Sequence, residues 1–464
     1  MHELNEKCGV FGVFGPGMDV SRLTFYGLFA LQHRGQEATG MCVTNGTHLL
    51  SKKGIGLVSS VYTEADIDSL LGHIAIGHNR YSTSNAESSP IDQVQPYVCR
   101  HEKLSIAHNG NLPSTKALED FLKERGIDVT GYNDSKLMHL AIECYMNDGN
   151  TVEEAVIKSY PLFTGAFSLL VMTHDTLIGV RDQFGMRPLS VGMVDKGYAF
   201  ASETCALKTI GTTLHWEVGA GEMIVCTKDG LKNVQIVPPK NKLDIFEFVY
   251  FSRPDSYILG QSVYKARWSS GYELAKEFPI EADIVVPIPE TAIPSAIGYS
   301  NYSKIPFELA LIKNRYINRT FIEPNQHIRK LGVALKLNII PTVVRGKRVI
   351  IIDDSIVRST TSEQLVKMLF QAGAKEVHFL VSSPPVKYPD FYGIDTPKQE
   401  DLIASQKSVE EIREKLGATS LHYLSLDGLV RAIGVSKEYL STSCFTGEYP
   451  IDIGDNMKNI NFNV

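Results

Sequence analysis

VIIIDDSIVRSTTS, residues 349–362, is the stretch that decides the fold of the second half of the chain. It starts with an unbroken apolar run, which is typical of a parallel strand covered by helices on both faces. The run ends in two adjacent acids, Asp353 and Asp354, and a loop of small polar residues leads from them into a helical pattern. Neighbouring carboxylates repel each other unless cations or hydroxyls engage them. The stretch therefore predicts a strand, a polar site and a helix, rather than a strand that simply ends.

The same alternation continues on both sides of this stretch. Strand-like and helix-like segments follow one another as ADIVVPIP (282–289), TAIPSAIGYS (291–300), RVIIIDD (348–354), TSEQLVKMLFQAGA (361–374) and EVHFLVSSPP (376–385). Strands that alternate with helices favour a parallel α/β sheet. We therefore expect an α/β domain over residues 245–464.

The first half has a different pattern. Short alternating or β-rich segments predict paired antiparallel sheets: CGVFGVF (8–14), HLLSKKGIGLV (48–58), HIAIGHNRYS (73–82), LSIAHNG (104–110), FSLLVMTHDTLIGVRD (167–182) and GEMIVCTKDG (221–230). Two helical stretches, one following Ser21 and one following Asp134, predict helices that cover these sheets in an α+β arrangement. The Pro- and Lys-rich stretch VPPKNKLD (237–244) is the expected boundary, which places the first domain at residues 8–237.

Composition limits the classes of function. The chain has 464 residues, 43% of them hydrophobic, and a formal net charge of −6, so it gives no electrostatic reason to expect nucleic acid or an anionic membrane as a partner. No apolar run reaches the roughly 20 residues of a membrane-spanning helix, and MHELNEK at the start is not a secretory signal. The seven cysteines are scattered, which favours a reducing, cytoplasmic location. Five of them are expected to be small buried hydrophobes: Cys42, Cys99, Cys144, Cys205 and Cys226.

Cys8 is placed differently, directly before a strand and after only seven residues. If residues 1–7 are a propeptide that is removed, Cys8 gains a free α-amino group with a reference pKa of about 8, near that of its own thiol at about 8.5. Such a group can act as general base for the thiol without a histidine. On its own, however, Cys8 would more simply be an ordinary strand cysteine.

The motifs around Cys8 make it part of a set. CGVFGVF, LQHRGQEATG (31–40), GHNRYST (77–83), AHNGNL (107–112) and NDSK (133–136) together resemble the class II, N-terminal-nucleophile glutamine amidotransferases. The resemblance implies that Cys8 is the nucleophile and that Asn109 and Gly110 form the oxyanion hole, since a developing oxyanion needs pre-aimed N–H donors. It also implies glutamine-binding roles for Arg80, Thr83 and Asp134: the guanidinium suits a carboxylate and the carboxylate suits an ammonium group.

Residues 349–362 resemble the binding fingerprint of type I phosphoribosyltransferases. The resemblance implies that a 5′-phosphate lies at the helix start, bound by Ser355, Arg358, Ser359, Thr360 and Thr361. Asp353 and Asp354 would face ribose hydroxyls and Mg²⁺, with Thr291 in VVPIPETAIPS (285–295) as a further metal ligand. Glu290 stands where many members of the family have Asp.

The basic segment 313–338 suits a lid that closes over a pyrophosphate leaving group and excludes water, although a solvated basic loop would look the same. The residues expected to act there are Lys313, Arg315, Tyr316 and Arg329.

The two halves in this order resemble the glutamine phosphoribosylpyrophosphate amidotransferases, over nearly the whole chain. The resemblance implies transfer of ammonia from glutamine to the anomeric carbon of phosphoribosyl pyrophosphate, the first step of purine synthesis. It further implies a homo-oligomer that purine nucleotides inhibit. One subgroup of the family holds an iron–sulfur cluster on four cysteines, but the matching positions here are Asp244, Asp390, Ser441 and Cys444. Since one thiolate cannot replace four, we expect no iron–sulfur cluster.

Two other functions remain open from the residues. The chain could be a salvage phosphoribosyltransferase with an idle glutamine domain, but Cys8, Arg80, Asn109 and Asp134 are all present. It could instead be a nucleotide-sensing binding protein on a phosphoribosyltransferase-like scaffold, which would be expected to lack the first half and to carry a basic face. A turnover assay separates these functions.

Overall fold

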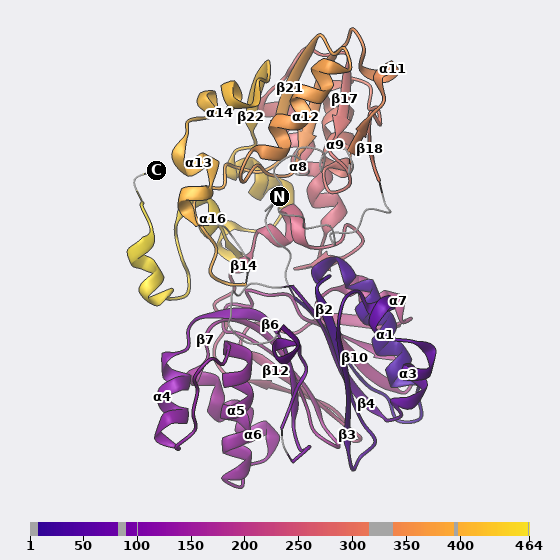
Figure 1. Cartoon of the computed structure of the whole chain (residues 1–464), viewed down its shortest axis with the longest axis vertical. Coiled ribbons are helices and arrows are strands. Elements are labelled where there is room, and N and C mark those ends of the chain that lie inside the picture. Colours follow the sequence, from indigo (N-terminus) through magenta and orange to yellow (C-terminus); the bar gives the residue numbers. More distant parts are fainter. Residues whose placement is uncertain (1–7, 82–89, 100, 315–336, 394–397, 463) are drawn as a thin grey trace.

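The structure, a computed structural model, describes residues 8–81, 90–99, 101–314, 337–393, 398–462 and 464. The first half is a sandwich of two antiparallel sheets (Figure 1). One sheet has seven strands, in the order β11 (Leu214–Glu217), β9 (Ser190–Val194), β10 (Gly197–Ala201), β1 (Gly9–Phe14), β4 (Ile74–Arg80), β2 (Ala38–Thr44) and β3 (Leu49–Ile55). The other has six strands, in the order β13 (Gly230–Gln235), β12 (Glu222–Thr227), β8 (Leu177–Arg181), β7 (Thr164–Met172), β6 (Ser105–Ser114) and β5 (Tyr97–Val98).

The two sheets are held together by an apolar layer that includes Val10, Phe14, Ile76 and Leu170. Helices cover both outer faces, so this half has four layers. The seven-stranded sheet packs against α1 (Val20–Ala30), α2 (Val58–Val61), α3 (Glu64–Ser69) and α7 (Thr204–Thr209). The six-stranded sheet packs against α4 (Lys116–Glu124), α5 (Asp134–Asn147) and α6 (Val152–Ser159).

Both helices expected in this half are present, but Ser21 and Asp134, the residues after which they were expected to begin, are already helical. The N-cap of α1 is Asp19, whose carboxylate accepts the backbone N–H of Arg22 at 3.0 Å, so Ser21 lies inside the first turn. The N-cap of α5 is Asn133, and Asp134 is already helical. Asp and Asn cap helices as well as Ser does, so the composition of the segment could not decide between them.

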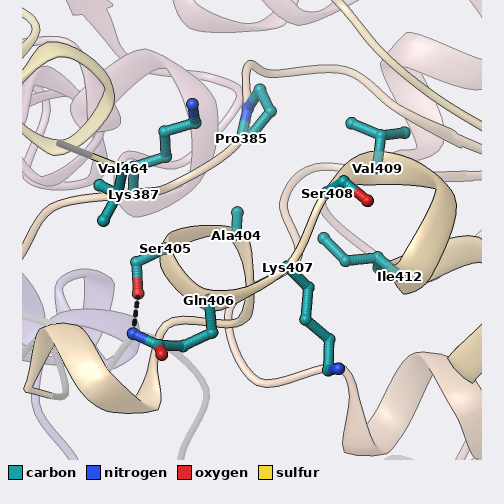
Figure 2. Close-up of a pocket in the computed structure, with 10 residues that line it drawn as sticks. All are labelled: Pro385, Lys387, Ala404, Ser405, Gln406, Lys407, Ser408, Val409, Ile412 and Val464. Carbon is teal, nitrogen blue, oxygen red and sulfur yellow. Dashed lines mark hydrogen bonds between the residues drawn. The ribbon is translucent and has the colours of Figure 1, made fainter.

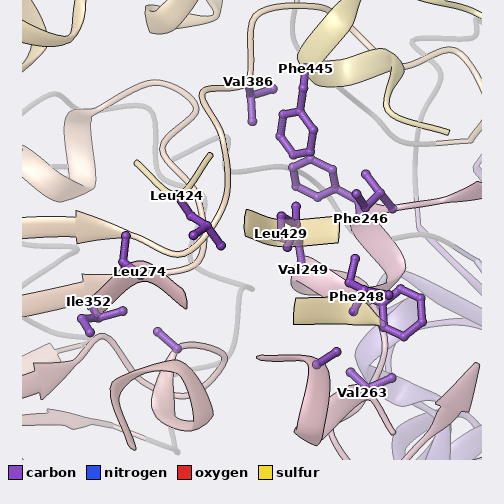
Figure 3. Close-up of a cluster of buried hydrophobic side chains, with 14 of the residues drawn as sticks. Phe246, Phe248, Val249, Val263, Leu274, Ile352, Val386, Leu424, Leu429 and Phe445 are labelled. Carbon is purple, nitrogen blue, oxygen red and sulfur yellow. The ribbon is translucent and has the colours of Figure 1, made fainter. Parts of the chain in front are cut away.

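The second half is built on a parallel sheet, as the apolar strands predicted. Its strand order is β17 (Ile284–Pro287), β20 (Arg348–Asp353), β21 (Glu376–Val381) and β22 (Ser420–Tyr423). Alternate residues of the strands face two separate cores. One core contains Ile352 and Leu380 together with α8 (Val263–Glu277), α9 (Ile293–Ser303) and α15 (Leu426–Ile433), and Figure 3 shows part of it. The other contains Ile351 and Phe379 together with α12 (Thr360–Gln371), α13 (Ile403–Gln406), α14 (Val409–Leu416) and the short α11 (Pro341–Val344).

The remaining strands of this half lie outside the main sheet. They are β15 (Tyr257–Ile258) with β16 (Gln261–Ser262), β18 (Leu311–Lys313) with β19 (Leu337–Ile339), and β14 (Leu243–Asp244) with β23 (Leu440–Ser441). The pairing of β14 with β23 joins the end of the expected boundary segment to the C-terminal part of the chain. The fold class predicted from the sequence is therefore confirmed in both halves.

A buried charged cluster links the two halves. Arg34 and Arg187 come from the first half, and their guanidinium groups contact the carboxylates of Glu247 and Asp244. Arg34 also contacts Glu203. Charges removed from water are strongly destabilising unless they are paired in this way. The two halves therefore meet at a specific polar contact.

Four of the five cysteines expected to be buried are buried, whereas Cys144 is half-buried. Among the residues that the structure describes, no helix is long and apolar enough to cross a membrane.

Candidate functional site

A cavity of about 190 Å³ opens at one end of the first-half sandwich. Four residues predicted from the sequence line it, namely Cys8, Arg80, Gly110 and Asp134. They come from the start of β1, the end of β4, the middle of β6 and the first turn of α5. The structure therefore brings together residues that lie up to 126 positions apart in the chain. Thr83, the remaining residue expected to bind glutamine, lies outside the described residues.

Cys8 immediately precedes β1, a central strand between β10 and β4. Its thiol donates to the carbonyl oxygen of Tyr81 over 3.9 Å. Burial raises the pKa of the Cys8 thiol, while the Tyr81 contact and the charge of Arg80 act in the opposite direction. A thiol in this state needs a nearby base to become a nucleophile.

Asn109 and Gly110 are neighbours on β6, but only Gly110 lines the cavity. Gly110 has a φ of +151°, and a methyl group there would lie 2.0 Å from the carbonyl oxygen of Ala166, so the position requires glycine. Asn109 is almost fully buried; its Nδ2 donates to Ser202 Oγ at 3.4 Å, and its Oδ1 has no hydrogen-bond partner among the described residues. The backbone of Gly110 thus borders the cavity, whereas the amide of Asn109 lies behind it.

Asp134 is fixed by several hydrogen bonds. Its Oδ2 accepts from the backbone N–H of Leu112 at 3.1 Å, and its Oδ1 accepts from the backbone N–H and the hydroxyl of Ser135 at 2.6 and 3.1 Å. Arg80 donates through Nη2 to Gln93 Oε1, and its Nη1 lies 4.0 Å from Glu37. A carboxylate and a guanidinium therefore face the same small cavity, as binding of a zwitterionic amino acid requires.

The sequence did not predict a set of buried polar residues beside the cavity. His78 and His108 belong to this set and also line the cavity, and the His78 ring donates through Nε2 to the carbonyl oxygen of His108 at 3.1 Å. Gln95 accepts the backbone N–H of His108 at 2.6 Å and donates to Ser135, whose hydroxyl also pairs with His108 Nδ1 at 2.8 Å. Burial lowers the pKa of His78 to about 3 and also lowers the pKa of His108, so both rings are neutral at pH 7. Both histidines lie within the motifs GHNRYST and AHNGNL, so these motifs could have indicated that they belong to the site.

In the second half, the acid pair lies at the carboxyl end of β20. Asp354 accepts hydrogen bonds from the hydroxyls of Thr291 and Ser355, the latter at 2.7 Å. The Asp353 Oδ1 accepts the backbone N–H of Asp354 at 2.9 Å. The structure thus brings the loop that contains Thr291 to the acid pair, 63 residues further along the chain. Ligands commonly bind at this edge of a parallel sheet.

The loop after the acid pair leads into α12. Ser359 occupies the N-cap position with a left-handed φ of 63°, and in the part of the chain that the structure describes its buried Oγ has no hydrogen-bond partner. A hydroxyl in this position at a helix start can donate a hydrogen bond to a bound anion. Arg358 is instead engaged at the surface, where its guanidinium lies 3.1 Å from Asp401. Thr360 and Thr361 form the first turn of α12.

Of the residues expected in the lid, Lys313 is exposed at the end of β18. Arg315, Tyr316 and Arg329 lie outside the described residues.

The four positions matched to a cluster-binding subgroup come together: Asp244 and Ser441 belong to the paired strands β14 and β23, and the charges of Asp244 and Asp390 act on Cys444. Burial raises the pKa of the Cys444 thiol well above its usual value, and Arg187 pairs with Asp244 at 3.0 Å. No group of three or more His, Cys, Asp or Glu side chains that could hold a metal occurs in the described part of the chain.

A larger hollow of about 430 Å³ lies in the second half, around Lys387, Lys407 and Ser408 (Figure 2). None of the predicted site residues that the structure describes lines it. Volume alone therefore does not locate the chemistry of this protein, and we assign the candidate sites by their side chains.

Comparisons with known proteins agree with both halves. Residues 78–209 match the family model of the glutamine amidotransferase domain. The chain is 44% identical over 458 residues to the amidophosphoribosyltransferase of Synechocystis sp., covering 98% of this chain and 92% of that one. It is 43% identical to the amidophosphoribosyltransferase of Bacillus subtilis, covering 97% of this chain and 95% of that one.

Solved structures give the same result. The glutamine phosphoribosylpyrophosphate amidotransferase from B. subtilis, complexed with ADP and GMP, superimposes with a TM-score of 0.89 at 42% identity, covering 96% of this chain and 98% of that one. A second structure, described as the allosteric regulatory enzyme of purine biosynthesis, gives a TM-score of 0.90, also at 42% identity, and covers 96% of this chain and 97% of that one.

Proposed function

Since this chain belongs to the amidophosphoribosyltransferases, we propose how its own residues divide the reaction of that family between two sites. The enzyme consumes glutamine, water and 5-phosphoribosyl 1-pyrophosphate and yields 5-phosphoribosylamine, glutamate and pyrophosphate, the first step of de novo purine synthesis. The observation that supports the assignment best is the shared cavity of Cys8, Arg80, Gly110 and Asp134.

In the first half, Cys8 attacks the side-chain amide carbon of glutamine. Arg80 binds the α-carboxylate and Asp134 binds the α-ammonium group, with Thr83 as a further contact to the carboxylate. The N–H of Gly110 and the amide of Asn109 stabilise the oxyanion, which requires the Asn109 amide to turn away from Ser202. The amide leaves as ammonia, and water then releases glutamate from the glutamyl thioester.

The thiol needs a base, because burial raises its pKa. The two buried histidines nearby do not have to fill this role. The α-amino group of Cys8 can accept the proton once residues 1–7 are removed. The domain limits proposed for the mature chain are therefore 8–237 and 245–464.

In the second half, the 5′-phosphate binds at the loop before α12, where the buried Ser359 hydroxyl is available. Ser355, Thr360 and Thr361 add hydroxyls, and Arg358 can reach the phosphate after releasing Asp401. Asp353 and Asp354 hold the ribose hydroxyls. Lys313, Arg315, Tyr316 and Arg329 cover the pyrophosphate and exclude water, which would compete with ammonia for the anomeric carbon.

The donor set at the acid pair fits Mg²⁺. Two carboxylates and the Thr291 hydroxyl are hard oxygen ligands, and Mg²⁺ in proteins is usually held by one or two carboxylates together with substrate phosphates. When bound, Mg²⁺ would neutralise charge on the departing pyrophosphate. The iron–sulfur cluster of the related subgroup does not fit, because Asp244, Asp390 and Ser441 offer no thiolate.

Regulation and assembly are further proposals. The B. subtilis relative was solved with ADP and GMP, which supports purine nucleotides as inhibitors of this enzyme. We also propose that the chain acts as a homo-oligomer in the cytoplasm, with glutamine and phosphoribosyl pyrophosphate as substrates.

A glutamine analogue with an electrophilic carbon in place of the amide tests the first site. Peptide mass analysis should find one adduct on Cys8, and the labelled enzyme should lose synthesis with glutamine but keep synthesis with ammonium. An adduct on any other cysteine would contradict the assignment. The intact mass of the same sample reports directly whether Met1–Lys7 are absent.

A further inference from the structure

The two halves of the chain are in direct contact at β6, the strand that carries Gly110. The side-chain Nδ2 of Asn111, on β6, donates to the backbone carbonyl oxygen of Phe391 at 2.8 Å. These residues lie 280 positions apart, one in each half of the chain. The second half therefore holds a residue directly adjacent to the proposed oxyanion hole.

This contact occurs where β6 loses its regular support. The β6–β7 ladder runs in register through Asn111 paired with Ala166, and the register then shifts before Ser114 pairs with Thr164. A shift of this kind leaves residues without ladder hydrogen bonds and bends the strand. Within this shift, the backbone N–H of Leu112 donates instead to Asp134 at 3.1 Å. Asn111 thus stands between the residue proposed to bind the oxyanion and the N–H that fixes the ammonium-binding carboxylate.

A second contact from the same segment supports Gly110 itself. A methyl group added to Gly393 would lie 3.0 Å from the carbonyl carbon of Gly110 and 3.1 Å from its Cα, so the two backbones pack closely. Gly393 has a φ of +105°, which only glycine adopts readily. The second half therefore contacts Gly110 directly, and the side chain of Asn111 as well.

The segment that makes these contacts is held firmly within its own half. Tyr392 donates its hydroxyl to the carbonyl oxygen of Ile451 at 2.6 Å, and its backbone N–H donates to Asp390 at 2.7 Å. Tyr449 donates to the carbonyl oxygen of Pro389 at 2.8 Å. The buried apolar residues of this contact come from both halves: Ala166, Met186, Tyr392, Ile451 and Ile453.

We propose that Asn111 is a positioning residue for glutamine hydrolysis: its hydrogen bond to Phe391, with the packing of Gly393 on Gly110, makes the oxyanion hole depend on the second half of the chain. The inference rests on the proposed role of Gly110. An oxyanion donor acts on charge that develops only in the transition state, so misplacing it lowers kcat and leaves the binding of glutamine largely unchanged.

The experiment measures kcat and KM for glutamine hydrolysis, and the rate of ammonium-dependent synthesis, in Asn111→Ala and Gly393→Ala. The first removes the donor from one half, and the second places a methyl group against Gly110 from the other half. Both variants should lower kcat about ten- to a hundredfold, with KM within about threefold of the unchanged enzyme, because displacing one donor costs less than removing it. Ammonium-dependent synthesis should be unchanged.

Two matched controls separate this role from a general loss of structure. Asn150→Ala also removes an asparagine that donates to a backbone carbonyl, that of Tyr145 at 2.7 Å. Gly230→Ala imposes a similar φ of +114° on alanine, with no atom within 4 Å of the added methyl group. Both should keep kcat for glutamine near normal.

An unchanged kcat in the two test variants overturns the proposal. A rise in KM alone also overturns it, because Asn111 would then be a substrate contact. So does a fall in ammonium-dependent synthesis as large as the fall in glutamine hydrolysis. Cys8→Ser is measured in parallel. If Cys8→Ser keeps glutaminase activity, the proposed function itself fails; if it loses that activity while Asn111→Ala keeps it, only the positioning role fails.

Discussion

Replacing Asp353 and Asp354 together by Asn removes two negative charges from the carboxyl end of β20 while nearly keeping the size of both side chains. The fold should survive. Asp354 accepts from the hydroxyls of Thr291 and Ser355, and hydroxyls can accept as well as donate, so an amide can replace the carboxylate there. The Asp353 bond to the N–H of Asp354 needs only an oxygen, which Asn retains. The expected cost in stability is about 1 kcal/mol, and the repulsion between two neighbouring carboxylates is relieved.

The expected cost in catalysis is much larger. A unit charge about 4 Å from a cation, at an effective dielectric constant near 20, contributes about 4 kcal/mol. Losing one such interaction in the transition state lowers the rate by roughly a thousandfold. In the proposed function the two charges act on the same metal and sugar, so their effects should not simply add. We therefore expect 5-phosphoribosylamine formation to fall by about three orders of magnitude or more, with either nitrogen source.

The assay compares ammonium-dependent synthesis, glutamine-dependent synthesis and basal glutamine hydrolysis. Basal hydrolysis should persist, because Cys8 and its cavity lie in the other half. Addition of phosphoribosyl pyrophosphate should not stimulate this hydrolysis in the double variant, because the second site no longer binds it productively. Asp283→Asn is the matched control: Asp283 lies at the opposite end of the sheet, where it pairs with Arg348 at 3.1 Å. The reasoning is refuted if the double variant, shown to be folded by circular dichroism, keeps ammonium-dependent synthesis within threefold of the control.

Three further predictions concern other residues. Asp134→Asn should raise KM for glutamine about ten- to a hundredfold while ammonium-dependent synthesis stays normal, since the counter-charge for the α-ammonium is lost; a normal KM in steady-state kinetics would contradict that role. Purified anaerobically, the protein should be colourless, because only one of the four positions matched to cluster ligands is a cysteine. About four irons per chain by metal analysis would contradict this expectation. Burial lowers the pKa of His139 to about 3, so the unfolded chain binds a proton at this residue more readily than the folded protein does. The free energy of unfolding therefore falls by about 1.4 kcal/mol for each pH unit as the pH drops from about 6.5 towards 3, and this residue has no effect of this kind above about pH 6.5. The thermal midpoint of His139→Leu should accordingly fall less steeply with pH in this range than that of the unchanged protein, and equal slopes would count against the prediction.

Local patterns were sufficient to predict both fold classes. The apolar run before Asp353 predicted a parallel strand covered on both faces, and the short β-rich segments of the first half predicted antiparallel strands. Strand β1 is nonetheless buried along its whole length, because the partner sheet covers one face of its sheet and helices cover the other. Helix starts were less certain, since Asp19 and Asn133 cap as well as the neighbouring residues do.

The candidate site was predictable only where a motif carries its chemistry. Cys8, Arg80, Gly110 and Asp134 were all named from motifs, and the structure places them around one cavity. The contact of Asn111 with Phe391 could not be predicted, because it joins segments from different halves and depends on tertiary packing. The inward packing of Asn109 against Ser202 likewise follows from the stacking of two sheets rather than from local sequence.

The central claim is that one chain holds two separable sites, with Cys8 as the nucleophile of the first. Paired initial rates of 5-phosphoribosylamine formation by Cys8→Ser, with glutamine and with ammonium as nitrogen source, test it most directly. We predict that the glutamine-dependent rate is lost while the ammonium-dependent rate remains within about twofold of the unchanged enzyme, because removing the nucleophile leaves the second site intact. Substantial glutamine-dependent synthesis by Cys8→Ser, or an equal loss with both nitrogen sources, would contradict the claim.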